Sequence, residues 1–121
     1  MTGQATVHIA ERERVAVASL AGELDLASID DLRARIVAAI REGAYGVVLD
    51  LRRVTFLDSS GLHLIFGLRR RLSRRGKRLA VIPPDERAVR QIFALVDIGA
   101  VVELSESIDD ALAYCRAPTA R

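Results

Sequence analysis

The sequence contains no tryptophan, one cysteine and few aromatic residues, which make up 4% of its 121 positions. Any core must therefore be built mainly from Leu, Val, Ile and Ala side chains. The single cysteine, Cys115, excludes an intrachain disulfide and a cysteine-based metal cluster, which suits a reducing cytosol. It is expected to be a small packing residue. Proline is also scarce and half of all residues are hydrophobic, so a disordered chain is not expected.

Long apolar runs are missing as well. A membrane-spanning helix needs roughly 20 apolar residues, whereas the best candidate, residues 92–102, is short and contains Asp97. The N-terminal region has no basic segment followed by an apolar stretch and a small-residue cleavage site, so no secretory signal is expected. We therefore predict a cytoplasmic protein that does not insert into membranes.

Motifs for catalysis and cofactor binding are absent from the sequence. Neither G-x-x-x-x-G-K-[ST] nor G-x-G-x-x-G occurs, so no phosphate-binding loop is predicted. His8 and His63 have no partner at metal-ligand spacing. No serine has an evident histidine and acid partner, although a triad assembled only by the fold stays open. We predict no metal, no cofactor and no enzymatic activity.

The basic residues are unevenly distributed, although the formal net charge is only +2. Seven of the 18 Lys and Arg residues lie between Arg69 and Arg78. Cations near a helix C-terminus complement its dipole, and only Leu72 in this segment must face inward. No aromatic residue is interleaved for base stacking, and no helix-turn-helix is recognisable. We predict a solvated face or a contact with an acidic protein, and no nucleic-acid partner.

Short apolar segments alternate with segments of helical periodicity. Strands are predicted at 6–9 and 15–20, joined by a charged turn, and later at 47–51, 78–82 and 100–104. Residues 21–25 are expected to form a loop. Helices are predicted from an N-cap at Ser28 to Gly43, from the turn at 58–61 to Gly76, from 85 to 96, and from an N-cap at Ser107 to 114.

This alternation predicts the fold class. Strands that alternate with helices form parallel crossovers, and the first two strands add an antiparallel pair. We therefore predict a single α/β domain over residues 1–121 with an ordered core at about 5–116. Its sheet is mixed but mostly parallel, begins with an antiparallel β-β pair, and packs against about four helices.

The most informative segment joins a buried strand to the start of a helix. Residues 46–51, Gly-Val-Val-Leu-Asp-Leu, have the continuous apolar character of a strand buried on both faces, with Asp50 expected to make a structural hydrogen bond. The sequence Asp-Ser-Ser-Gly follows at 58–61, where the next helix begins. Ligands and partners usually bind at the carboxyl ends of such strands. A serine hydroxyl at this helix start can cap the helix or carry a phosphate.

Three segments together resemble a known family. Gly-Glu-Leu-Asp at 22–25, Val-Leu-Asp-Leu at 48–51 and Val-Thr-Phe-Leu-Asp-Ser-Ser-Gly-Leu at 54–62 resemble the STAS domain, and most closely that of bacterial anti-sigma factor antagonists. The Asp-Ser-Ser-Gly tetrapeptide alone would be a weak signal, but its spacing from the two upstream segments makes it specific. The resemblance covers nearly the whole chain, and the order of elements agrees from end to end.

The resemblance implies a STAS-like fold and a regulator rather than an enzyme. Such a protein binds an anti-sigma factor and thereby releases a sigma factor. The anti-sigma factor is typically also a serine kinase that phosphorylates the antagonist and ends binding, and a serine phosphatase restores it. The resemblance places the phosphorylation at Ser59, and it places Asp25 and Asp58 near that serine as residues that affect binding or phosphorylation.

Ser60, Gly61 and His63 complete the predicted surroundings of Ser59. From the residues alone, simpler roles stay open: both serines as helix caps, and both aspartates as turn carboxylates, with Asp58 as an N-cap. His63 lies one helical turn after Ser59 and is expected to be exposed. Relatives often carry a small residue at this position, which leaves the choice of partner open.

Two alternatives to an anti-sigma factor antagonist follow from the same sequence. The first is a stand-alone STAS subunit of another assembly, such as a stress-signalling complex or a transporter-associated regulator. The second is a small flavodoxin-like hydrolase or phosphotransferase that uses the strand-end serines. The enzyme is the least favoured, because the sequence offers no base, metal site or phosphate loop for it.

Overall fold

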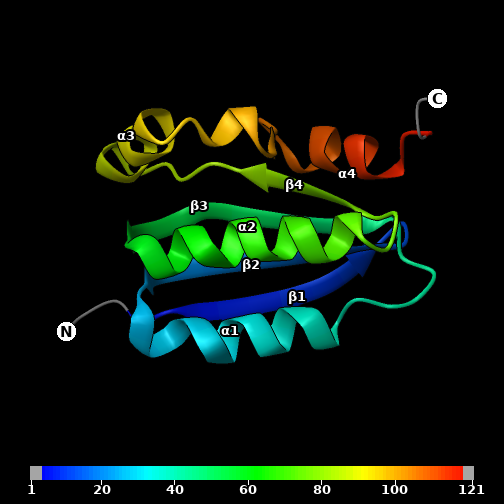
Figure 1. The fold of residues 1–121 in the computed structure, drawn as a ribbon, viewed down its shortest axis with the longest axis horizontal. Coiled ribbons are helices and arrows are strands. Elements are labelled where there is room, and N and C mark those ends of the chain that lie inside the picture. Colours follow the sequence, from blue (N-terminus) through cyan, green and yellow to red (C-terminus); the bar gives the residue numbers. More distant parts are fainter. Residues whose placement is uncertain (1–3, 119–121) are drawn as a thin grey trace.

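The computed structural model describes residues 4–118, which form a five-stranded sheet packed against four helices (Figure 1). The strands lie in sequence order across the sheet; β1 pairs with β2 antiparallel, and every other neighbouring pair is parallel. This confirms the predicted α/β class and the mixed, mostly parallel sheet. The elements are β1 Thr6–Arg12, β2 Val15–Leu24, α1 Leu26–Ala38, β3 Gly46–Leu57, α2 Ser59–Ser73, β4 Arg78–Ile82, α3 Arg87–Leu95, the 3-10 turn η1 Ile98–Ala100, β5 Glu103–Leu104 and α4 Ile108–Arg116.

The first two strands form the hairpin that the sequence predicts. The register pairs Arg12 with Val15, so the connecting turn consists of Glu13 and Arg14 alone. Both residues have positive φ, 53° and 64°, as a tight two-residue turn between twisted strands requires. The sequence also predicts an ordered core at about 5–116. Part of this prediction concerns residues 1–3 and 119–121, which are not among the described residues.

Three predicted strands were too short, since β1 also runs on to Arg12, and the loop expected at 21–25 was wrong. Strand β2 runs on to Leu24 and β3 runs six residues beyond Leu51, because the two pair in parallel as far as Leu24 and Leu57. The two adjacent arginines at the start of 52–57 concealed this extension. Arg52 and Arg53 expose their side chains while their backbones stay in the strand.

Boundaries near helices also differ from the prediction, and three of the differences have a clear cause. Helix α1 begins after Asp25 rather than Ser28, because the Asp25 carboxylate caps its first turn. The same helix ends at Ala38, with Ala39 as its C-cap, before the predicted stop at Gly43. The last strand shrinks to Glu103–Leu104, because residues 98–100 form a 3-10 turn instead.

Aliphatic residues build the core on both faces of the sheet, as the scarcity of aromatics predicts. Helices α1 and α2 cover one face, where Val89 and Phe93 of α3 join the same core, and α4 covers the other face. Cys115 of α4 is buried in the second core, which confirms its packing role. Burial raises the pKa of its thiol to about 11, so at neutral pH this group is an uncharged apolar filler.

Asp50 is the one carboxylate buried in the central strand. It accepts hydrogen bonds from Nε and Nη2 of Arg52 at 2.9 and 2.7 Å and from the Arg52 backbone N–H at 3.2 Å. Burial by itself raises the pKa of Asp50, but the hydrogen bonds and positive charge of Arg52 together outweigh burial and hold the pKa below its ordinary value. The predicted structural role of Asp50 is confirmed.

Replacing Arg52 with Gln should lower the free energy of unfolding at pH 7 by about 1–3 kcal/mol, because the carboxylate stays buried without its cation. The pKa of Asp50 in the folded protein lies below its unfolded value of about 3.9. The Asp50–Arg52 pair therefore stabilises the fold fully at pH values above the unfolded pKa, and this stabilisation is lost as the pH falls toward the folded-state pKa. Urea unfolding at stepped pH should show that the difference in free energy of unfolding between wild type and Arg52→Gln narrows below pH 5. An equal gap at pH 7 and pH 2.5 would contradict this assignment.

Candidate functional site

The two longest strands bring the predicted site residues to one edge of the sheet. Strands β2 and β3 are parallel and end together, with Leu24 in register with Leu57. The backbone N–H of Asp58 still donates to the carbonyl of Leu24, at 3.3 Å, so the chains separate only beyond this point. Asp25 and Asp58 therefore follow neighbouring strand ends, and helices α1 and α2 begin beside each other.

Each aspartate caps the helix that follows it. The Asp25 carboxylate accepts from the Ser28 backbone N–H at 3.2 Å, and the Ser28 hydroxyl oxygen accepts from the Asp25 N–H at 3.3 Å, which completes a capping box. The Asp58 carboxylate accepts from the Ser60 N–H at 2.8 Å. These contacts confirm Asp58 as an N-cap and leave the two following serines without that task.

Ser59 is the first residue of α2, and its side chain is exposed. Ser60 is partly buried. Neither hydroxyl makes a hydrogen bond within residues 4–118, where no buried polar side-chain atom lacks a partner either. The hydroxyl of Ser59 can therefore be modified without breaking a contact of the described fold.

Gly61 fixes the position of this first turn. A Cβ at Gly61 would lie 2.8 Å from Cγ of Leu57 and 3.3 Å from Cβ of Leu24, both of which are buried. Only a residue without a side chain lets α2 approach the two strand ends so closely. Gly61 therefore sets how far Ser59 projects beyond the sheet.

His63 is exposed, as predicted, and lies one helical turn after Ser59 on the same side of α2. Two exposed apolar residues beside the aspartates escaped the sequence analysis. Leu26, which follows Asp25, is 76% exposed, and Phe56, two residues before Asp58, is 47% exposed. Their signal in the sequence was an apolar residue within two positions of each capping aspartate.

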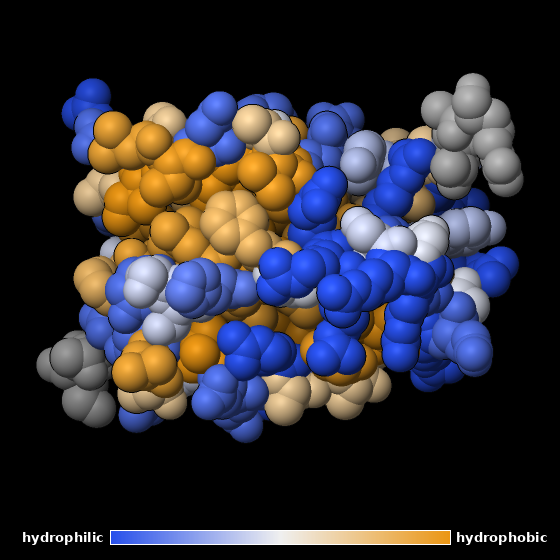
Figure 2. All heavy atoms as spheres, in the orientation of Figure 1, coloured by the Kyte–Doolittle hydropathy of each residue, from blue (hydrophilic) through white to orange (hydrophobic). Residues whose placement is uncertain are grey.

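The far end of α2 carries the arginine cluster. Leu72 is buried and Arg69, Arg70, Arg71 and Arg74 are exposed, as predicted. Figure 2 shows hydrophobic side chains over α3 and beside the first turns of α2, and hydrophilic ones over its last turns. The site thus lies where an apolar surface meets the serine end of α2, with a basic surface at the other end.

Residues 4–118 contain no group of three or more His, Cys, Asp or Glu side chains placed to hold a metal ion. None of the described helices combines the length and apolar character that a bilayer crossing demands.

Comparison with known proteins gives consistent matches. A family model described as "STAS domain" matches residues 6–111. The "Anti-sigma F factor antagonist" of Lysinibacillus sphaericus is 34% identical over 89 residues, which cover 73% of this chain and 74% of that protein. An anti-sigma factor antagonist from Mycobacterium paratuberculosis has a similar structure, with a TM-score of 0.81, 26% identity, and coverage of 93% and 95% of the two chains.

The antagonist SpoIIAA is a further structural match, and its structure is known in two forms. The unphosphorylated form matches with a TM-score of 0.75 and 26% identity over 95% of this chain and 100% of that one. The phosphorylated form, described as a Bacillus cell fate determinant, matches with a TM-score of 0.68 and 26% identity over 92% of this chain and 100% of that one.

Replacing Gly61 with Ala should lower the free energy of unfolding by about 1–3 kcal/mol, because the added methyl overpacks against Leu57 and Leu24. Gly67 in the same helix is the matched control. A Cβ there meets no atom within 4 Å, so Gly67→Ala should raise stability by about 0.5–1 kcal/mol through helix propensity. Urea denaturation measures both variants. Equal effects of the two substitutions would show that Gly61 holds no close contact.

Proposed function

Because the chain belongs to the STAS domain family, we propose that it is an anti-sigma factor antagonist, switched off by phosphorylation of Ser59. The family's anti-sigma factor antagonists are regulatory proteins rather than enzymes. The observation that carries the proposal is the position of Ser59. The Ser59 hydroxyl is exposed and makes no hydrogen bond with the described residues. It lies on the first turn of α2, which Asp58 caps.

The partner surface centres on the edge where β2 and β3 end. Asp25, Asp58 and Ser59 stand together there, with Leu26 and Phe56 exposed beside them. Exposed apolar side chains next to polar groups are typical of a protein-binding surface. An anti-sigma factor that covers this edge would bury the Ser59 hydroxyl as a neutral group.

Phosphorylation would change the charge of this surface and leave the fold intact. A phosphate adds about −1.5 to −2 charges at pH 7 beside the carboxylate of Asp58. The positive end of the α2 dipole offsets part of that charge internally. A partner fitted to a neutral hydroxyl would instead have to desolvate a dianion, which is costly without a matching cation.

The proposed switch also needs a kinase, a phosphatase and a cellular compartment. The anti-sigma factor acts as the serine kinase of Ser59, and a serine phosphatase restores binding. The site of action is the cytoplasm, because a sigma factor works with RNA polymerase there. A phosphorylated structure exists for the similar protein SpoIIAA, which supports this cycle for the present chain.

Incubation with ATP and the cognate anti-sigma factor should add one phosphate at Ser59, as peptide mass spectrometry measures. Ser59→Ala should abolish labelling and shift the free energy of unfolding by less than about 0.5 kcal/mol, because Asp58 and not Ser59 caps α2. Ser60→Ala is the matched control and should still be labelled. A phosphate found mainly on Ser60 would overturn the residue assignment.

Ser59→Asp and Ser59→Glu should fold normally and bind the anti-sigma factor at least tenfold more weakly, because a carboxylate is costly to bury in the interface. Each is an incomplete mimic with less charge than a phosphate. Calorimetry of wild type, both variants and the authentic phosphoprotein measures the effect. Unchanged affinity for all three modified forms would rule out this switch.

A further inference from the structure

The outward face of α2 connects Ser59 with the arginine cluster. At about 100° per residue, Ser59, His63, Gly67, Arg70 and Arg74 fall within an arc of about 80°. The buried residues Leu64, Ile65, Leu68 and Leu72 lie on the opposite side of the helix. A partner lying along the outward side of α2 would therefore meet the serine at one end and the arginines at the other.

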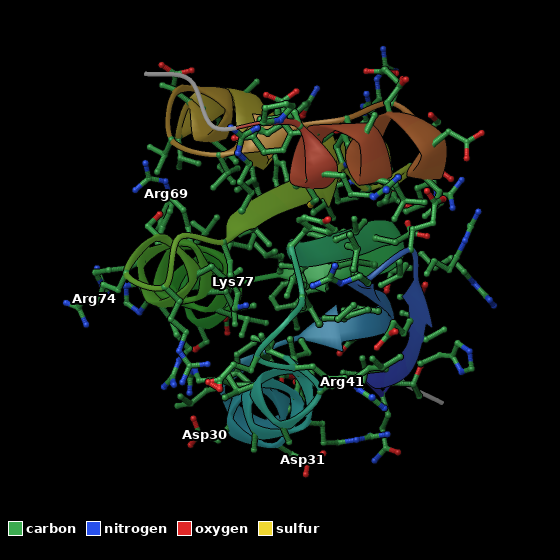
Figure 3. The ribbon with its side chains drawn as sticks, turned by 90° about the vertical axis from the view of Figure 1, so that its right-hand side faces the viewer. Asp30, Asp31, Arg41, Arg69, Arg74 and Lys77 are labelled. Carbon is green, nitrogen blue, oxygen red and sulfur yellow. The ribbon has the colours of Figure 1, made fainter. Side chains whose placement is uncertain are left out.

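Five arginines gather on α2 and the turn after it without a carboxylate partner among the described residues. Within residues 4–118, Arg12, Arg33, Arg41, Arg52 and Arg116 each pair with a carboxylate of the same chain. The residues Arg69, Arg70, Arg71, Arg74 and Arg75 make no ion pair or side-chain hydrogen bond with any described residue. Figure 3 shows Arg74 pointing away from α2 into solvent and Arg69 pointing toward the side of α3. The fold leaves this positive charge uncompensated.

Most of these arginines surround a groove between α1 and α2. The groove has a volume of about 450 Å³ and is lined by Arg33, Gly67, Leu68, Arg70, Arg71, Arg74 and Arg75. Arg33 comes from α1 and the rest from the second half of α2 and the turn after it. Arginines therefore make up most of its lining residues, with Leu68 as an apolar side chain among them.

Gly67 has no steric role within the chain. A Cβ at Gly67 would meet nothing within 4 Å, and glycine weakens the middle of a helix. Gly61 needs its missing side chain to pack on the strand ends, whereas Gly67 has no such neighbour. A glycine on an open helix surface lets the backbone of another molecule approach closely.

We infer that the groove formed by Arg33, Gly67, Arg70, Arg71, Arg74 and Arg75 is a docking site for an acidic segment of the protein that binds at Ser59. The inference rests on the proposed function, since it assigns a second contact to the same anti-sigma factor. Charge complementarity defines the occupant as a Glu- and Asp-rich segment, and Gly67 lets its backbone pack against α2. Helix α2 is about 22 Å long. A standard interface of about 800 Å² per partner is roughly 30 Å across, so one partner can cover both ends.

The composition of the groove disfavours nucleic acid. Its lining contains no aromatic side chain on which a base could stack. A nucleic acid would also gain nothing from the close approach at Gly67, because phosphates are reached by long side chains above the helix surface. A protein segment uses both the charges and the glycine.

Stopped-flow association of the cognate anti-sigma factor tests this docking site. Arg70→Gln/Arg74→Gln should reduce the association rate constant about tenfold at 50 mM salt and flatten its salt dependence. The matched control Arg12→Gln/Arg41→Gln removes the same charge from exposed ion pairs at the same end of the sheet but outside the groove, and should change the rate less than twofold. Gly67→Leu should weaken affinity about tenfold without lowering the melting temperature, since a Cβ at this position has no atom within 4 Å and the rest of the side chain extends into the groove.

The outcomes separate this inference from the proposed function. If Ser59→Asp abolishes binding while Arg70→Gln/Arg74→Gln and Gly67→Leu bind like wild type, the groove assignment fails and the antagonist function stands. If wild type does not bind the anti-sigma factor, both fail. An equal reduction of the association rate constant in Arg70→Gln/Arg74→Gln and in the control double variant would overturn the groove assignment, because the change in net charge alone would explain both reductions. Retention of wild type on duplex DNA or anionic vesicles at physiological salt, lost in Arg70→Gln/Arg74→Gln, would also overturn it.

Discussion

The parallel pairing of β2 with β3 is the constraint on which the site depends. The two strands remain paired until Leu24 and Leu57, so Asp25 and Asp58 leave the sheet at the same level. Each aspartate then caps a helix, and the two helix starts lie beside each other. A shift of register by one residue would turn Leu57 from the core toward solvent and displace Ser59 with it. The geometry of the site is therefore held by backbone pairing and not by the site residues themselves.

Packing at Gly61 and the cap at Asp58 make Ser59 a rigid position for a charge. The first turn of α2 sits against Leu24 and Leu57 with no room for a side chain, and its N–H groups are held by Asp58. A charge added at Ser59 thus acts mainly on whatever covers the edge. The same rigid helix fixes the distance between Ser59 and the basic groove. In the proposed switch, phosphorylation at one end and electrostatic attraction at the other would therefore act as separate contributions along one surface.

The sequence predicted those features that local chemistry determines. Ser107 as a cap, Leu72 as the inward residue of the basic cluster, and the exposure of His63 all follow from residue type and helical spacing. The extension of β3 to Leu57 did not, because Arg52 and Arg53 look like loop residues until β2 supplies their backbone partners. Asp25 was missed as a cap for the same reason, since residues 21–24 belong to a strand whose pairing partner is distant in sequence. The sequence also could not predict the groove, because Arg33 and Arg70 line the same surface only when α1 packs beside α2.

Hydrogen–deuterium exchange of the unphosphorylated protein, with and without its anti-sigma factor, tests the central claim most directly. The account predicts that binding slows exchange at residues 25–29 and along α2 from Ser59 to Arg74, and leaves β1 and α4 unchanged. Slower exchange confined to 58–63 would limit the interface to the strand-end edge. Protection centred on β1 or α4, with none on α2, would contradict the account.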